Sequence, residues 1–66
     1  MNEVDYIEKA LKQRRSDLTD AIASGAAQSF DQYRYLCGQL LGVESGLAVI
    51  AELRQNYEDQ EEATMQ

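Results

Sequence analysis

The sequence predicts an all-α fold, an antiparallel hairpin with one helix over about residues 3–24 and a second over about residues 30–58. Two runs of apolar residues recur at alternating steps of three and four, which is the spacing of helices that pack along one seam. Gly25 and Ser29 separate the two runs, and the chain of 66 residues contains no proline. We therefore expect residues 1–66 to form a single helical-hairpin domain.

The first helix is expected to begin after Asn2, a good N-cap residue, because Glu3 and Asp5 then lie in the first turn, where the helix dipole favours negative charge. Its seam positions are Val4, Ile7, Leu11, Leu18, Ala21 and Ile22. Arg14 occupies the seam position between two of these leucines, where its methylenes can pack while its charge reaches solvent. Gly25, just past the last turn, predicts the end of this helix.

Only residues 26–28 connect the two helices, and so short a loop makes them antiparallel neighbours. With the turn centred near residue 27, opposed positions should have numbers that sum to about 54. The predicted pairs are Leu18 with Leu36, Leu11 with Val43, Ile7 with Leu47, and Val4 with Ile50. Leu53 and Tyr57 then lie on an overhang that the first helix does not cover.

The second helix is expected to begin at a capping box made by Ser29 and Gln32, in which the serine oxygen accepts a backbone N–H and the glutamine side chain reaches back. Its seam positions are Tyr33, Leu36, Leu40, Val43, Leu47, Ile50, Arg54 and Tyr57. We place Leu40 at the centre of the seam. Because the acids after Tyr57 oppose the helix dipole, we expect a frayed, acidic tail over about residues 59–66.

Gly38, Gly42 and Gly46 repeat every fourth residue and should centre, with Ser45 and Val49, roughly opposite the seam. Each glycine inside a helix costs about 1 kcal/mol relative to alanine, unless close packing offsets the cost. Small residues simply tolerated on an exposed side are one reading. The regular spacing favours the other, a groove for a second backbone. The predicted interface residues are Tyr35, Gly38, Leu41, Gly42, Gly46, Val49, Leu53 and Tyr57.

The composition argues against an enzyme. There is no histidine, the commonest general base and metal ligand. Cys37, the only cysteine, sits in an apolar stretch and is expected to be a small core residue. The acidic pairs lack the pattern of a calcium loop. We assign no catalytic residue, no cofactor and no metal.

The formal charge of −6 disfavours a broad nucleic-acid surface and favours a basic partner. A cluster of basic residues in the first helix leaves RNA binding as an alternative, and in architecture alone the hairpin resembles the small helical dimer that binds paired RNA loops and regulates plasmid copy number. Residues 35–52 contain no Lys, Arg or Asp, but they include glutamate and three glycines, so no membrane span is expected.

The segment Phe30 to Leu47, FDQYRYLCGQLLGVESGL, carries a family likeness. It resembles short proteins encoded in the structural gene region of tailed bacteriophages, which often share the pattern Tyr-x-x-Leu-x-Gly-x-x-x-Gly-Leu. Tyr33, Leu36, Gly38 and Gly42 match, and Val43 replaces the final leucine. The resemblance implies an accessory or assembly component of a phage head or head-to-tail region, located in the virion or the host cytoplasm, with no catalytic residue.

These observations together predict a small non-enzymatic assembly or accessory protein that acts through helix–helix contacts. The second helix has more apolar surface than the first can cover, so we expect a homo-oligomer. A dimer that forms a four-helix arrangement is the favoured assembly. Phage structural proteins are further expected partners. An acidic, phage-encoded inhibitor or regulator of a host protein is the alternative from another functional class.

Overall fold

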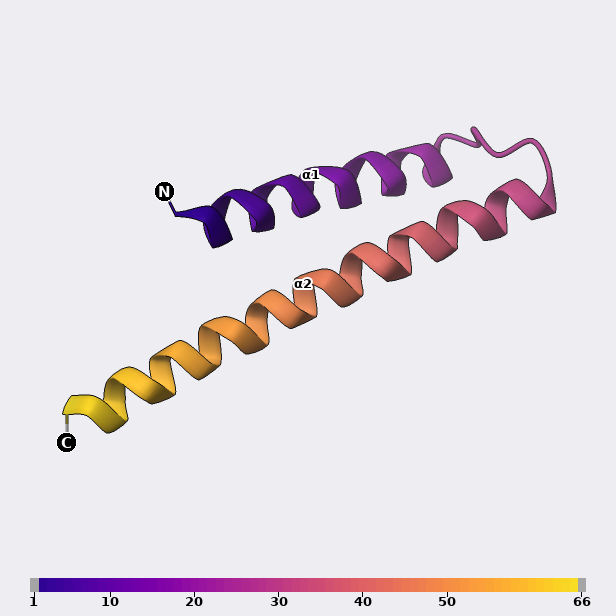
Figure 1. Ribbon diagram of the computed structural model, residues 1–66. Coiled ribbons are helices and arrows are strands. Elements are labelled where there is room, and N and C mark those ends of the chain that lie inside the picture. The colour runs from indigo at the N-terminus through magenta and orange to yellow at the C-terminus, as the bar shows by residue number, and fades with distance from the viewer. Residues whose placement is uncertain (1, 66) are drawn as a thin grey trace.

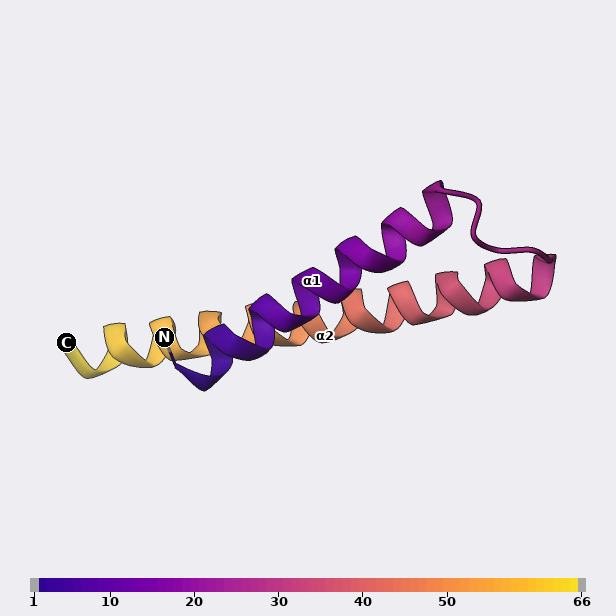
Figure 2. The same cartoon turned by 90° about the horizontal axis from the view of Figure 1, so that it is seen from above.

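The computed structural model describes residues 2–65, with side chains described for residues 2–58. Helix α1 spans Glu3–Ala23 and helix α2 spans Phe30–Met65, and no strand occurs in residues 2–65. The two helices pack side by side and antiparallel, crossing at an angle (Figures 1 and 2). The result is a rod of about 56 × 20 × 14 Å. The predicted all-α helical hairpin is confirmed.

Both ends of α1 are built from local hydrogen bonds. The Asn2 side chain accepts a hydrogen bond from the Asp5 N–H at 2.8 Å, and the Asp5 carboxylate accepts one from the Asn2 N–H at 3.5 Å. At the other end Gly25 adopts a φ of 75°, its N–H donates to Ile22 O, and the Ala26 N–H donates to Ala21 O. This pair of bonds is a Schellman motif. The predicted cap at Asn2 and stop at Gly25 are both confirmed.

The start of α2 follows half of its predicted capping box. The Ser29 Oγ accepts a hydrogen bond from the Gln32 N–H at 3.1 Å, as expected. The Gln32 Oε1 accepts one from the Gln28 N–H at 2.7 Å, and not from the Ser29 N–H. The glutamine therefore reaches one residue further back and ties the connection, as well as the helix start, to the first turn of α2.

The register of the hairpin differs from the predicted one. The connection runs on beyond the end of α1 before it reaches α2, so the first turn of α2 projects past α1 (Figure 1). Val4 lines a hollow together with Leu53 and Tyr57. Leu11 lies close to Gly46, since a β-carbon added to that glycine would be 3.5 Å from Leu11 Cδ1. Val4 with Leu53 and Leu11 with Gly46 both have numbers that sum to about 57 instead of 54, so the observed register is shifted by about three residues along α2. Leu53 and Tyr57 lie beside the N-terminus of α1 and do not overhang it, although both remain exposed, as predicted.

The predicted seam of α2 is confirmed, with its centre moved. Val43 and Ile50 are the buried side chains, at 9% and 8% exposed. The half-buried seam positions around them are Leu36, Leu40, Leu47 and Arg54. Tyr33 and Tyr57, at the ends, are exposed. Leu40, which we placed at the centre, is therefore a flanking position.

The seam of α1 departs from the prediction at Ile7, and Arg14 at its predicted seam position is exposed as well. Val4, Leu11, Leu18 and Ile22 are half-buried as expected, whereas Ile7 is 50% exposed. Its neighbour Glu8 is half-buried instead, because its carboxylate pairs with Arg54 of α2. A step of one residue turns a helix by about 100°, so placing Glu8 toward α2 turns Ile7 toward solvent.

Helix α2 runs on to Met65, beyond the predicted end at about residue 58. Residues 58–65 contain neither glycine nor proline, and most of them are Glu, Gln, Ala or Met. These residue types have high helix propensity. Propensity therefore outweighs the unfavourable position of the acids at the negative end of the helix dipole.

The seam predicts a contrast between Ile50→Ala and Leu41→Ala. Ile50 is 8% exposed and Leu41, of equal size on the same helix, is 66% exposed. Because truncating a buried aliphatic side chain leaves a cavity, Ile50→Ala should lower the free energy of unfolding by about 2 to 5 kcal/mol. Leu41→Ala should lower it by less than about 1 kcal/mol. Urea unfolding followed by circular dichroism measures both, and equal losses would show that the seam is misplaced.

Candidate interaction surface

One side of α2, which adjoins the seam with α1, carries most of the exposed apolar surface of that helix. Tyr35 is 67% exposed, Val49 61% and Tyr57 58%, and Leu53 is also exposed. At about 100° per residue these four side chains share one stripe with the three glycines of the helix. We call the following set the outer stripe: Tyr35, Gly38, Gly42, Gly46, Val49, Leu53 and Tyr57. The structure thus brings together every predicted interface residue except Leu41.

Leu41 lies about 100° around the helix from the outer stripe. It shares that side of α2 with Cys37, Ala48 and Phe30, of which Phe30 is exposed and stacks on Tyr33 with the ring centroids 6.5 Å apart. The Arg34 guanidinium lies 5.9 Å from the centroid of the Phe30 ring. This Leu41 side is therefore shorter, carries charge at its end, and is a separate candidate surface.

The three glycines are not required by the packing of the hairpin. A β-carbon at Gly38 or Gly42 would meet nothing within 4 Å, and one at Gly46 would make an ordinary contact of 3.5 Å with Leu11. The contact also corrects the predicted geometry, because it shows that the glycine face adjoins the seam and is not opposite to it. Alanine would fit at all three positions and would favour the helix by about 1 kcal/mol each. The hairpin alone therefore gives no reason for glycine.

The outer stripe is free of charge along its length. The charged residues of α2 between its two tyrosines are Glu44, Glu52 and Arg54. At about 100° per residue each of them lies about 80° or more from the centre of the stripe. Removing an apolar, uncharged surface of this kind from water has a low free-energy cost, because no charged group has to be desolvated.

An ion-pair cluster, which the sequence analysis missed, fixes α1 against α2 beside this stripe. Arg54 Nη2 lies 2.5 Å from Asp5 Oδ1, and Arg54 Nε lies 3.4 Å from Glu8 Oε2. Nε itself is out of solvent and poorly aligned for a hydrogen bond, while Nη2 also donates to Glu8 Oε1 at 3.4 Å. One guanidinium thus holds two carboxylates one turn apart on α1, which sets the register of the N-terminal half of the hairpin.

The cluster shifts the protonation of its members. The hydrogen bond from Arg54, followed by the one from the Asn2 backbone, lowers the pKa of Asp5 below its ordinary value of 3.8. The same hydrogen bond to Asp5 raises the pKa of Arg54. Because the charged forms are favoured in the folded state, Asp5 contributes stability at neutral pH that depends on its ionisation.

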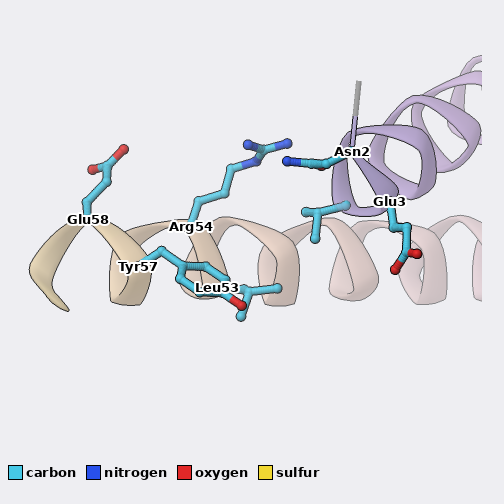
Figure 3. A pocket seen from close by; sticks show the side chains of 7 residues that line it. Asn2, Glu3, Leu53, Arg54, Tyr57 and Glu58 are labelled. Carbon is cyan, nitrogen blue, oxygen red and sulfur yellow. The ribbon is translucent and has the colours of Figure 1, made fainter. Parts of the chain in front are cut away.

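A hollow of about 760 Å³ opens where the N-terminus of α1 meets α2, at one end of the outer stripe. It is lined by Asn2, Glu3, Val4, Leu53, Arg54, Tyr57 and Glu58. Leu53 and Tyr57 point to one side of α2, and Arg54 and Glu58 point to the other (Figure 3). Since Arg54 already holds Asp5 and Glu8, the apolar side with Leu53 and Tyr57 is the part of the hollow that offers unpaired surface.

Other chemistry is sparse in the part of the chain with described side chains. Residues 2–58 contain no group of three His, Cys, Asp or Glu side chains placed to hold a metal ion. Cys37 is half-buried, and its thiol raises the pKa of Tyr33, one turn away. We see no nucleophile paired with a base in this region.

By length and composition, helix α2 is long and apolar enough to cross a membrane, although the sequence prediction expected no membrane span. A window of 18 residues within Phe30–Glu58 has a mean hydropathy of 1.4, and 11% of that window is buried in the hairpin. The same length and composition also describe a helix whose apolar side packs against another protein chain.

Comparison with protein-family models, with curated proteins and with solved structures gives no match. The surface of the hairpin is therefore the guide to what the chain does. Its main feature is the outer stripe, which is apolar, uncharged and left uncovered by α1.

The ion-pair cluster predicts a dependence of stability on pH. The pKa of Asp5 is lowered in the folded state, so its contribution is present above about pH 4, near the pKa in the unfolded chain, and is lost as the pH falls through the lower folded value. Asp5→Asn should therefore lower the midpoint temperature of unfolding at pH 7. Near pH 2 the difference in midpoint between this variant and the wild type should be smaller.

Glu3→Gln is the matched control, because it removes one acid from the same turn without touching Arg54. Thermal unfolding of the wild type and both variants at pH 7 and pH 2 gives the comparison. A gap between Asp5→Asn and wild type that does not change with pH would contradict the assigned ion pair.

Proposed function

We propose that this chain is a small, non-enzymatic assembly or accessory protein that works through helix–helix contacts, and that the outer stripe joins it to a second copy of itself. The observation that carries the proposal is the exposure of the stripe, where Tyr35, Val49 and Tyr57 are each more than half exposed. Apolar surface gathered in one place on a small protein usually marks an interface.

The energetics of so small a domain support self-association. A chain of this length buries only about 60% of the surface that its unfolded form exposes, which leaves it marginal as a monomer. Among the described side chains only Val43 and Ile50 are buried in the hairpin, and both keep 8 to 9% of their surface exposed. No disulfide can form within the chain, because Cys37 is its only cysteine. Oligomerisation is the remaining common way to stabilise a domain of this size.

The resemblance of Phe30 to Leu47 to phage proteins adds a setting to the proposal. That segment contains the first half of the outer stripe, with Tyr35 and all three of its glycines. In that setting the dimer acts as a structural component or assembly factor of the phage head or head-to-tail region, in the virion or the host cytoplasm. Co-purification of the chain with intact virions is the expected result, and its absence from them would remove this setting.

The acidity of the chain favours a second candidate function. With a net charge of −6, the hairpin suits an inhibitor or regulator that binds a basic surface of a host protein. A complex with a host protein that weakens steeply with salt would support it. The exposed basic residues of α1 are Lys9, Lys12, Arg14 and Arg15. Binding of RNA with a steep salt slope would point to them instead.

The proposal predicts the effect of bulk on the two sides of α2. Gly42→Leu adds a side chain on the outer stripe, where nothing lies within 4 Å in the hairpin, so the seam should tolerate it. A leucine there holds the second backbone away, and the dissociation constant of the dimer should rise at least about tenfold, which corresponds to about 1.4 kcal/mol. Sedimentation at micromolar concentration measures the constant.

Ala48→Leu is the matched control, since it adds a similar side chain on the exposed Leu41 side. It should leave the dimer intact. A wild-type chain that sediments as a monomer would refute self-association. A dimer that Ala48→Leu weakens and Gly42→Leu does not would move the interface to the Leu41 side.

A further inference from the structure

From the pattern of the outer stripe we infer that two copies pair with their α2 helices antiparallel, around a two-fold axis beside Gly46, and that each copy places Tyr35 at the hollow of the other. The inference rests on the proposed self-association. It adds the direction of the pairing, its register and the contacts at its ends.

The first support is a match of size along the stripe. In an antiparallel pair centred on Gly46, positions whose numbers sum to about 92 lie opposite each other. Gly42 then faces Val49 of the second copy, Gly38 faces its Leu53, and Tyr35 faces its Tyr57. Each aliphatic side chain then faces a glycine, above which the hairpin leaves open space.

A parallel pair has no such match. It would set Gly38 against Gly38, Gly42 against Gly42, and Tyr57 against Tyr57. The glycine half of the stripe would then approach closely while the half with Val49 and Leu53 would hold the helices apart. Because close packing on both halves requires small against large, the sequence of sizes favours the antiparallel pair.

Charge supports the same direction. The stripe itself is uncharged, but α2 continues into an acidic run that begins at Glu58. A parallel pair would bring two such runs side by side. In the antiparallel pair they lie at opposite ends, about 40 Å apart at 1.5 Å per residue. This exceeds the screening length of about 10 Å at ordinary salt, so the repulsion between the runs is small.

The hollow at the N-terminus of α1 is a second feature that the pairing explains. It lies at the Leu53 and Tyr57 end of the stripe (Figure 3), and Val4 of α1 also lines it. Tyr35 of the second copy comes opposite Tyr57 and meets this open, apolar side. Two aromatic rings that meet there in an offset or edge-to-face arrangement add about 0.5 to 1.5 kcal/mol beyond the area they bury. By symmetry the contact occurs twice.

The extent of the contact suits a stable pair. From Tyr35 to Tyr57 the stripe is about 33 Å long at 1.5 Å per residue, which is the length of a helix that crosses a small domain. Because α1 lies beside the stripe and not over it, both α1 helices stay on the flanks of the pair. The assembly is then a bundle of four helices, with the two α2 helices at its centre.

Disulfide trapping tests the direction and register. In a Cys37→Ala background, three variants carry one cysteine each: Ser45→Cys next to the axis, and Gly42→Cys and Val49→Cys on either side of it. A disulfide needs Cα atoms within about 7 Å. Ser45→Cys should therefore cross-link to itself under mild oxidation. Gly42→Cys should not cross-link to itself, because the two cysteines are separated by about 12 Å along the direction of the helices.

The decisive sample mixes Gly42→Cys with Val49→Cys, one of them carrying a longer tag so that the mixed product has its own mobility on a gel. The mixed disulfide should form in at least about tenfold excess over either homodimer, because only the mixed pair has its Cα atoms within about 7 Å. Ala48→Cys, on the Leu41 side, is the control and should give no cross-link.

Self-linked Gly42→Cys and Val49→Cys would indicate a parallel pair and overturn the inference. So would the absence of every stripe cross-link in a protein that still sediments as a dimer, although the proposed function would survive that result. A Cys37→Ala protein that stays monomeric, with or without binding to phosphatidylcholine vesicles, would refute both together.

Discussion

A single helix can cover only one side of another, and this limit shapes the whole molecule. Helix α1 lies along the seam of α2 and buries Val43 and Ile50, with four half-buried positions around them. Helix α2 is longer and carries apolar residues on further sides, of which Tyr35, Leu41 and Val49 remain more than 60% exposed. The free energy that the hairpin gains by burial is correspondingly small. Our proposal covers these exposed sides of α2 with a second layer of protein.

The contacts between the helices divide into two kinds with different roles. The apolar seam supplies attraction, but it tolerates sliding, because one aliphatic residue packs against another in several registers. The ion-pair cluster is directional, since the Arg54 guanidinium reaches both Asp5 and Glu8 in one position only. Asp5 also closes the capping box at Asn2, so the first turn of α1 is joined to α2 through the residue that starts the helix. The end of α1 nearest the hollow is thus held in place.

Much of the fold follows from local sequence signals, and the differences arise where contacts distant in sequence decide. Helix type, the cap at Asn2, the stop at Gly25 and the seam of α2 depend on residues within a turn or two, so spacing and capping rules predict them. The register depends on the path of residues 24–29, which extends past α1 before the chain reverses, and no local rule gives that path. The exposure of Ile7 and the burial of Glu8 follow from the partner at Arg54, which lies 46 residues away from Glu8. Seven of the eight predicted interface residues share one side of α2, the outer stripe, whereas Leu41 is equally apolar but lies on another side of the helix.

The central claim is that α2 is covered by a second copy of the chain, and the dependence of stability on concentration tests it most directly. If folding and pairing are coupled, mass action stabilises the folded state as the concentration rises. The urea midpoint, followed by circular dichroism at 222 nm, should then increase steadily over about a hundredfold range of protein concentration, from micromolar upward. A midpoint that stays the same across that range would contradict the account.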